Sequence, residues 1–225
     1  MLITTLIVRN EALRPWLKNC LIKASEYSDK IVILDDKSDD DGQTKDLCKS
    51  FPKVIFYESV FDKPWFPIHQ SDFRIQQWDL TRQNAKEGDW ILALDSDNVF
   101  EDSFKKELPG LMSSTYDWFQ FQLLDLWDKE HYRNDGWWSP LIQCMFRFKN
   151  EPANWPRATM HVPLLPGYVL SSSNGCVRKD IRLLHYGWIE KEKRDSKVEF
   201  YKARCTGDNL RHALSVLEPA QLAEV

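Results

Sequence analysis

The sequence lacks closely spaced cysteines and long apolar runs. Its five cysteines are odd in number and widely spread, so a structural zinc site of the CxxC kind is not indicated. Reduced thiols are the simpler account, and we therefore expect a cytoplasmic protein. The apolar start at residues 1–8 is too short to cross a bilayer and has no basic segment before it. It predicts a buried first strand, and no other run reaches the length of a transmembrane segment.

An excess of basic residues is also missing. The formal net charge is -4 over 225 residues, which argues against broad binding to nucleic acid, because such binding needs clustered Lys and Arg. With 43% hydrophobic and 28% charged residues, the chain has the composition of a soluble globular protein rather than of a disordered or fibrous one. We expect a single folded domain.

Short apolar runs alternate with segments of helical spacing in the first half. We expect buried strands at 2–8, 31–34, 54–57 and 90–94. Helices are expected at 11–25, 45–50 and 71–86, the last one capped by Ser71. This alternation predicts an α/β fold with a Rossmann-like, mostly parallel sheet. Beyond it, strands at 118–124, 142–148 and 181–184 and helices at 101–112 and 190–204 predict a mixed part that forms the acceptor side of an enzyme.

Two carboxylates one residue apart, in Asp95-Ser96-Asp97, follow the expected strand at 90–94. They can converge on one hard cation, Mn²⁺ or Mg²⁺, which oxygen ligands select. Such a cation neutralises a diphosphate leaving group. Acidic triplets are common in solvated turns and helix caps, but ligands bind at the carboxyl ends of parallel strands. The position of this triplet therefore favours a functional centre.

A second acidic pair, Asp35-Asp36, ends the strand at 31–34. An ionised carboxylate there can accept hydrogen bonds from a uracil or ribose edge. We interpret Asp39, Asp40 and Asp41 as part of a solvated acidic loop.

Three motifs follow one another in order: Val8-Arg9-Asn10-Glu11, then Ile31-Val32-Ile33-Leu34-Asp35-Asp36-Lys37-Ser38 with Asp41-Gly42-Gln43-Thr44, then Asp89-Trp90-Ile91-Leu92-Ala93-Leu94-Asp95-Ser96-Asp97. Together they resemble the family 2 glycosyltransferases with the A-type nucleotide-sugar-binding fold, closely in the first half of the chain and loosely in the rest. The ordered set is far more specific than any one motif. One departure is Asn98, where many relatives carry an acidic residue.

The resemblance implies a role for each motif. It assigns the nucleotide base to Val8, Asn10 and Glu11, and the uracil or ribose to Asp35, Asp36 and Ser38. It assigns the diphosphate and the metal ion to Asp95, Ser96 and Asp97. It divides residues 1–225 into a nucleotide-sugar-binding half at 1–101, an acceptor-side half at 102–205 and a C-terminal tail or helix at 206–225.

The activity that the resemblance implies is an inverting, metal-dependent transfer. A sugar would move from a nucleoside-diphosphate sugar, with UDP as the expected nucleotide, to an acceptor hydroxyl. The sequence does not identify the sugar, and the acceptor stays open among glycan, protein, lipid and nucleic acid.

Basic and histidine residues outside these motifs are further candidates for the donor site. Arg74 resembles a basic position that the family places near the diphosphate, and Arg82 competes with it; either can instead be a surface arginine. His185 in Leu184-His185-Tyr186-Gly187-Trp188 resembles a late histidine motif and is a candidate third metal ligand. Arg194 and Lys197 are candidates to close over the diphosphate, or are solvated helix charges.

The general base is sought in the segment 124–135. The candidates are Asp125, Asp128 and Asp135, with His161 as an outsider. Asp128 is favoured because Trp127, Trp137 and Trp138 can form an aromatic floor for a sugar. The alternative is that these tryptophans belong to the core.

Two other functions remain open. A nucleotidyltransferase also binds nucleotides on an α/β sheet with a carboxylate-held cation, but the Gly-rich loop expected after its first strand is replaced by Arg9-Asn10-Glu11. A non-catalytic sugar-binding protein with the same fold is compatible with the missing acid at Asn98. Turnover of a nucleotide sugar distinguishes the three.

Overall fold

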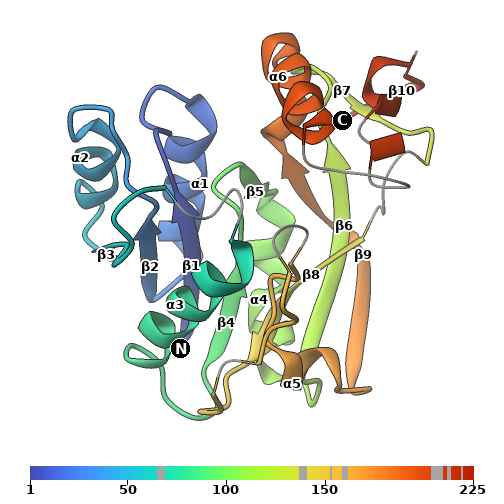
Figure 1. Cartoon of the computed structure of the whole chain (residues 1–225). Coiled ribbons are helices and arrows are strands. Elements are labelled where there is room, and N and C mark those ends of the chain that lie inside the picture. Colours follow the sequence, from blue (N-terminus) through green and yellow to red (C-terminus); the bar gives the residue numbers. More distant parts are fainter. Residues whose placement is uncertain are drawn as a thin grey trace.

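A computed structural model describes residues 1–64, 69–136, 141–152, 154–158, 162–203, 210–211, 214–218 and 220–225. In this part of the chain one large sheet forms the centre of the molecule (Figure 1). Its eight strands, in order across the sheet, are β3 (Val54–Glu58), β2 (Lys30–Asp35), β1 (Leu2–Val8), β4 (Trp90–Ala93), β8 (Leu141–Arg147), β6 (Trp118–Asp125), β9 (Gly175–His185) and β5 (Asn98–Phe100).

The first four strands are parallel to one another, as the alternation of strands and helices predicts. Every residue of β1 is buried, which is why its sequence is apolar or β-branched along its whole length. In the β1–β2 register Val8 lies opposite Asp35. The residues that follow these strands therefore meet at one edge of the sheet.

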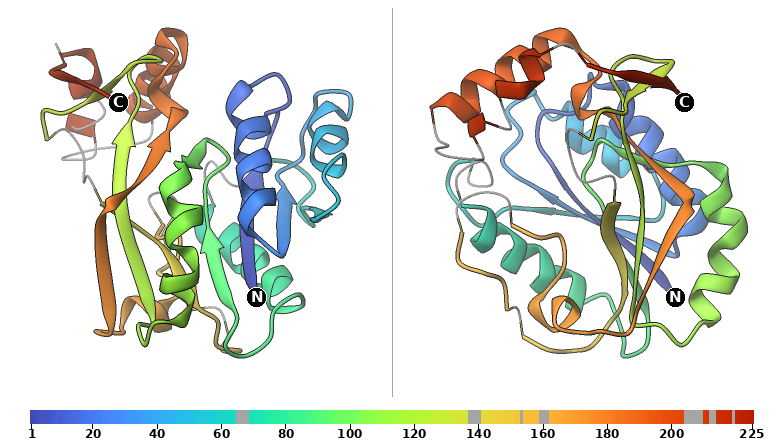
Figure 2. Two further views of the ribbon diagram at one scale, coloured as in Figure 1. Left: turned by 180° about the vertical axis from the view of Figure 1, so that it is seen from behind. Right: turned by 90° about the vertical axis from the view of Figure 1, so that its right-hand side faces the viewer.

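Helices cover both faces of the sheet (Figure 2). On one face lie α1 (Pro15–Tyr27), α2 (Gln43–Lys49) and α4 (Asp102–Ser113), which share a core with the sheet through residues such as Leu17, Cys48 and Phe104. On the other face lie α3 (Gln70–Arg82) and α5 (Gly167–Leu170), which pack through Trp78 and Val169. Because both faces are covered there, β1, β2 and β4 are buried along almost their whole length.

The second half of the sheet is mixed. β8 runs antiparallel to both β4 and β6, β6 is parallel to β9, and β5 closes the edge antiparallel to β9. The expected α/β fold, with a mostly parallel sheet and a mixed part, is thus confirmed. β9 begins six residues before the expected residue 181, because its early part is an exposed, charged segment in which Arg178 pairs with Asp180 and Glu107.

Above the carboxyl ends of β6 and β9 lies a small C-terminal layer (Figure 1). It contains η1 (Tyr186–Trp188), α6 (Lys191–Lys202), η2 (Ser215–Leu217) and a two-stranded sheet of β10 (Leu222–Glu224) and β7 (His131–Arg133). Trp188, Val198 and Val216 form its own small core. This layer brings α6 over the site described below.

In the described part of the chain, no helix is both long and apolar enough to span a bilayer. The cysteines described there are free thiols: Cys20, Cys48, Cys144 and Cys176.

Candidate functional site

A cavity of about 660 Å³ lies at the carboxyl ends of β1, β4, β6 and β9. Its volume is in the range of small-molecule sites. It brings together ten of the residues that the sequence singles out: Val8, Glu11, Asp36, Arg74, Asp95, Ser96, Asp97, Asp125, His185 and Lys197.

His185 lies between two carboxylates. Its Nδ1 is 2.5 Å from Oδ1 of Asp125, and its Nε2 is 3.5 Å from Oδ2 of Asp97. Strand pairing sets this geometry, because β6 places Asp125 opposite His185 and β5 places Asn98 opposite the same residue. The backbone N–H of Tyr186 also donates to the carbonyl of Asp97, at 2.9 Å.

Neighbouring charges and burial shift the pKa values of His185, Asp97 and Lys197. Burial alone would lower the pKa of His185, but Asp97 and Asp125 raise it to about 10. Burial alone would raise the pKa of Asp97, but His185 and Lys197 hold it below its ordinary value. Lys197 is itself desolvated, which lowers its pKa. The result is a compact group of alternating charges at one end of the cavity.

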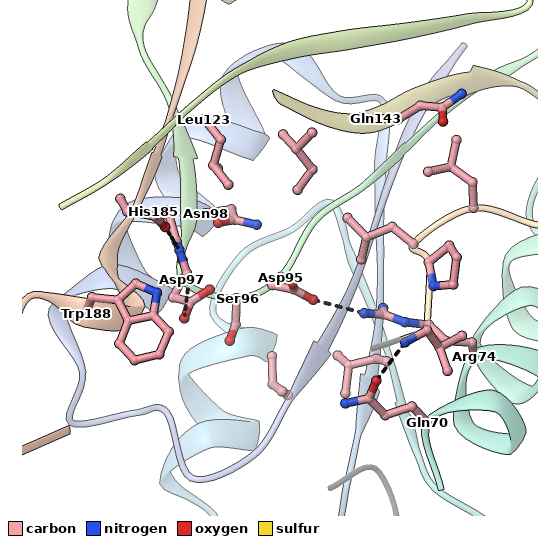
Figure 3. A pocket seen from close by; sticks show the side chains of 18 of the residues that line it. Gln70, Arg74, Asp95, Ser96, Asp97, Asn98, Leu123, Gln143, His185 and Trp188 are labelled. Carbon is pink, nitrogen blue, oxygen red and sulfur yellow. Dashed lines mark hydrogen bonds and ion pairs between the residues drawn. The ribbon is translucent and has the colours of Figure 1, made fainter. Parts of the chain in front are cut away.

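Asp95 points the other way, toward Arg74 (Figure 3). Nη2 of Arg74 lies 3.1 Å from Oδ1 of Asp95, and the arginine side chain is only 4% exposed. Nη1 of Arg74 donates to Gln77, whose amide donates to the hydroxyl of Thr5 on β1. Arg74 is therefore a rigidly held cation inside the cavity, whereas its competitor Arg82 bonds Asn150 and Asp79 at the surface.

The donor set near Asp97 fits a divalent cation. Nε2 of His185 and the Asp97 carboxylate face each other, and the Asp125 bond to Nδ1 is the kind of contact that orients a ligating histidine. Oδ1 of Asn98, which also lines the cavity, is buried and has no hydrogen-bond partner. A cation at Nε2 would replace the proton of the imidazolium. Within the described residues, however, no preformed cluster of three or more His, Cys, Asp or Glu is present, since Asp95 is turned toward Arg74.

Another part of the cavity wall is formed by the loops after β1 and β2. Glu11 accepts a hydrogen bond from the indole N–H of Trp16 at 2.7 Å, and burial raises the pKa of its carboxyl. Asp36 lines the cavity and is almost fully buried. These two carboxyl groups can accept hydrogen bonds from a ligand in this part of the cavity.

Three residues expected to bind the nucleotide form hydrogen bonds within and between these two loops. Asp35 accepts hydrogen bonds from the backbone N–H and the hydroxyl of Ser38. The Ser38 hydroxyl in turn accepts from the N–H of Asn10, a residue with φ of 53°. Asp35, Ser38 and Asn10 are absent from the cavity lining, so the structure gives them a loop-forming role.

Several other expected site residues lie outside the cavity. Asp128 caps a turn, accepting the N–H groups of Glu130 and His131, which hold its pKa below the ordinary value. Asp135 pairs with Arg133. Arg194 stacks over Trp127 and donates to backbone carbonyls, including that of Trp127 at 2.9 Å.

These contacts place Asp128, expected as the base, and Arg194, expected at the diphosphate, outside the described cavity lining. Trp127 lies under Arg194 and Arg133 and is not part of the described cavity lining. His161, Trp137 and Trp138 fall outside the described residues.

The polar lining residues that sequence reasoning missed include Gln70, Asn98 and Gln143. Gln70 lies one helical turn before Arg74, so the four-residue spacing was a usable signal. Asn98 was noted only as a missing acid. Gln143 lies within an apolar strand and carries no such signal.

No protein-family model matches the chain, and no curated protein matches it in sequence. The solved structures that are similar to it include the following two. One is described as a glucose-1-phosphate thymidylyltransferase from Bacillus anthracis in complex with sucrose, with 12% identity and a TM-score of 0.46 over 94% of this chain and 99% of that chain. The other is mannose-6-phosphate isomerase from Helicobacter pylori, with 9% identity and a TM-score of 0.39 over 60% of this chain and 56% of that chain. The function therefore rests on the geometry of the cavity.

Proposed function

We propose that the chain is a glycosyltransferase of the A-type fold. It moves a sugar from a nucleoside-diphosphate sugar, with UDP as the nucleotide, to an acceptor hydroxyl with inversion. The observation that carries this proposal is the continuity of one cavity. Glu11, Asp36, Asp95-Ser96-Asp97 and Asp125 all line it, at the edge of the sheet where open α/β folds bind ligands.

The charges along the cavity suit a nucleotide sugar. Glu11 and Asp36 accept hydrogen bonds from the base and ribose. Arg74 and Lys197 lie on either side of the acidic triplet and bind the diphosphate. Asp97 and His185 would hold Mn²⁺ or Mg²⁺, with Asp95 as a second carboxylate. The cation, when bound, stabilises the charge that develops on the leaving diphosphate.

Asp125 is the general base in this proposal. Of the three candidate aspartates it alone lines the cavity, and its bond to His185 fixes the orientation of its carboxyl group. It takes the proton of the acceptor hydroxyl as that oxygen attacks the anomeric carbon, opposite the departing diphosphate.

A nucleotidyltransferase is the second candidate. The observation in its favour is that three cationic side chains, Arg9, Arg74 and Lys197, line the cavity, which suits a triphosphate together with a sugar phosphate. The loop after β1 argues against it, since Arg9-Asn10-Glu11 contains no glycine for close backbone approach to phosphates. The two functions differ in their leaving group, nucleoside diphosphate or pyrophosphate.

The test is a screen of UDP-, GDP- and dTDP-sugars with Mn²⁺ in the absence of an acceptor, measuring nucleoside diphosphate release. We expect slow hydrolysis of one donor, abolished by EDTA and retained in Asp128→Asn, whose carboxylate lies outside the cavity. A parallel reaction contains nucleoside triphosphate and sugar 1-phosphate. Pyrophosphate release in that reaction alone would transfer the assignment to a nucleotidyltransferase. Release of neither product, with the sugar still bound, would favour a non-catalytic sugar-binding protein.

A further inference from the structure

The two halves of the cavity differ in chemistry. Up to residue 98 its lining residues are mostly charged or amide side chains: Arg9, Glu11, Asp36, Gln70, Arg74, Asp95, Asp97 and Asn98. Between residues 123 and 170, by contrast, eight of the ten described lining residues are aliphatic. They include Leu123, Leu141, Val162, Leu165 and Leu170. The aliphatic half begins next to Asp125, so it continues from the reacting end of the cavity.

The aliphatic wall is held by the body of the protein. Leu123 lies two residues before Asp125 on β6 and so shares a face of the strand with it; in Figure 3 it lies on the same side of the cavity as Asn98 and His185. Leu165 is 2% exposed within one of the cores. The N–H of Val162 donates to Gln70 at 3.1 Å, and the carbonyl of Pro163 accepts from Trp155 at 2.8 Å. The wall is therefore preformed.

Such a wall is a poor match for a saccharide acceptor. A sugar carries hydroxyl groups on all sides, and each hydroxyl pressed against aliphatic carbon loses its hydration without gaining a partner. A hydrocarbon gains free energy from the same contact. Leu170 is 42% exposed and extends the apolar lining toward solvent, which gives a longer hydrocarbon chain a way out.

We propose that the acceptor is an amphipathic alcohol, a hydroxyl group carried by a hydrocarbon chain. This proposal rests on the proposed glycosyltransferase function. The hydroxyl lies beside Asp125 and the chain lies along Leu123, Leu141 and the segment 162–165. The acceptor oxygen forms a bond to the anomeric carbon, the bond from that carbon to the diphosphate breaks, the electron pair leaves on the nucleoside diphosphate, and the proton passes to Asp125.

The test uses primary n-alkanols from ethanol to octanol as acceptors with the donor found by the hydrolysis screen. We expect kcat/KM to rise about fourfold per methylene until the wall is covered, the factor that corresponds to burial of one CH₂ group. Leu141→Asn should lower kcat/KM for octanol about tenfold more than kcat/KM for ethanol. Leu170→Asn, at an exposed position that tolerates a polar residue, should give a smaller loss in the same direction. Ile22→Asn on α1, with a similar 43% exposure, should show none.

A binding experiment tests the amphipathic acceptor separately from the glycosyltransferase function. Equilibrium dialysis with radiolabelled butanol, hexanol and octanol, without any donor, measures the affinity of the cavity directly. We expect Kd to fall with chain length in the wild type and in Ile22→Asn. In Leu141→Asn the difference in Kd between butanol and octanol should be smaller. Donor hydrolysis with equal kcat/KM and Kd along the series would overturn the amphipathic acceptor and leave the glycosyltransferase intact. Chain-length-dependent binding without turnover of any nucleotide sugar would support the apolar site and overturn the glycosyltransferase.

Discussion

At the scale of single residues, Asp97 contacts the site through both its backbone and its charged side chain. Its carbonyl accepts the N–H of Tyr186, while its carboxylate faces His185 and lies close enough to Lys197 to lower its own pKa. A neutral side chain of the same shape would keep the first contact and remove the charge. That separation makes Asp97→Asn an informative substitution.

We expect Asp97→Asn to lose the dependence of UDP binding on metal. In the wild type Mn²⁺ should tighten UDP, because the cation screens the diphosphate from the carboxylates. In the variant the affinity for Mn²⁺ should fall about tenfold to a hundredfold, the range seen when groups that support a metal site are removed. Isothermal titration of UDP with Mn²⁺ and with EDTA measures both effects. Asp128→Asn is the matched control, and an unchanged metal effect in Asp97→Asn would refute the assignment of Asp97 as a ligand.

At the scale of secondary-structure elements, the short helix η1 joins β9 to α6 and brings three site residues together. It follows His185 and precedes the helix that carries Lys197. A Cβ atom on Gly187 would lie 2.7 Å from Oδ2 of Asp97 and 2.7 Å from Nζ of Lys197, and closer still to Nε2 of His185. Only the absence of a side chain at this position allows the three groups to meet.

Gly187→Ala should therefore inactivate the protein without unfolding it. The added methyl group has to displace His185 or Lys197 from the cavity, and misplacement of this order can cost about a hundredfold in rate. Donor hydrolysis and thermal unfolding of the same sample are the two measurements. Gly110→Ala on α4 is the control, since a Cβ atom there meets nothing within 4 Å. Equal activity of the two variants would show that the close approach at Gly187 has no functional role.

The helix α4 anchors the mixed half of the sheet. The Phe104 ring on this helix stacks on Phe100 of β5 at 4.0 Å between centroids and meets Tyr27 of α1 edge-on at 5.0 Å. Phe104 has no exposed surface. It thus joins two helices to the edge strand that follows the acidic triplet.

We expect Phe104→Ala to lower the free energy of unfolding by about 3 to 5 kcal/mol, the usual cost of the cavity that such a truncation leaves. The midpoint of urea unfolding reports the change. Val60→Ala, at a position that is 77% exposed, should stay within about 0.5 kcal/mol of the wild type. A loss below about 1 kcal/mol for Phe104→Ala would mean that the surrounding rings close over the gap.

At the scale of the whole molecule, the parallel half could be predicted from the sequence because its signals are local. β1 is found at the expected residues, since a strand buried on both faces needs an unbroken apolar or β-branched run. The helix expected to be capped by Ser71 starts at Gln70 instead, and the Ser71 hydroxyl donates to the carbonyls of Pro156 and Ala158. β5 was missed because its three residues are held by β9, far along the chain.

The candidate site also has a part that the sequence predicts and a part that it does not. The carboxylates that follow β2 and β4 lie at one edge of the sheet because parallel strands end at the same edge. The Asp125–His185 contact was not predictable, because it depends on the register of two strands that are distant in sequence, and that register shifts between Phe121 and Gln122. A slip of one residue would turn Asp125 to the other face. Asp128 lies outside the cavity for a local reason, the turn that its side chain stabilises.

The pairing of β6 with β9 also sets the order in which the molecule can become active during its synthesis. A nascent chain that has emerged from the ribosome only as far as β8 already contains β1 to β4 and the acidic triplet, but it contains neither His185 nor Lys197. Parallel strands that are distant in sequence pair late, because a long loop has to close first. On the proposed function, an unfinished or C-terminally clipped chain that ends before β9 would therefore lack two of the residues assigned to the diphosphate and the metal ion.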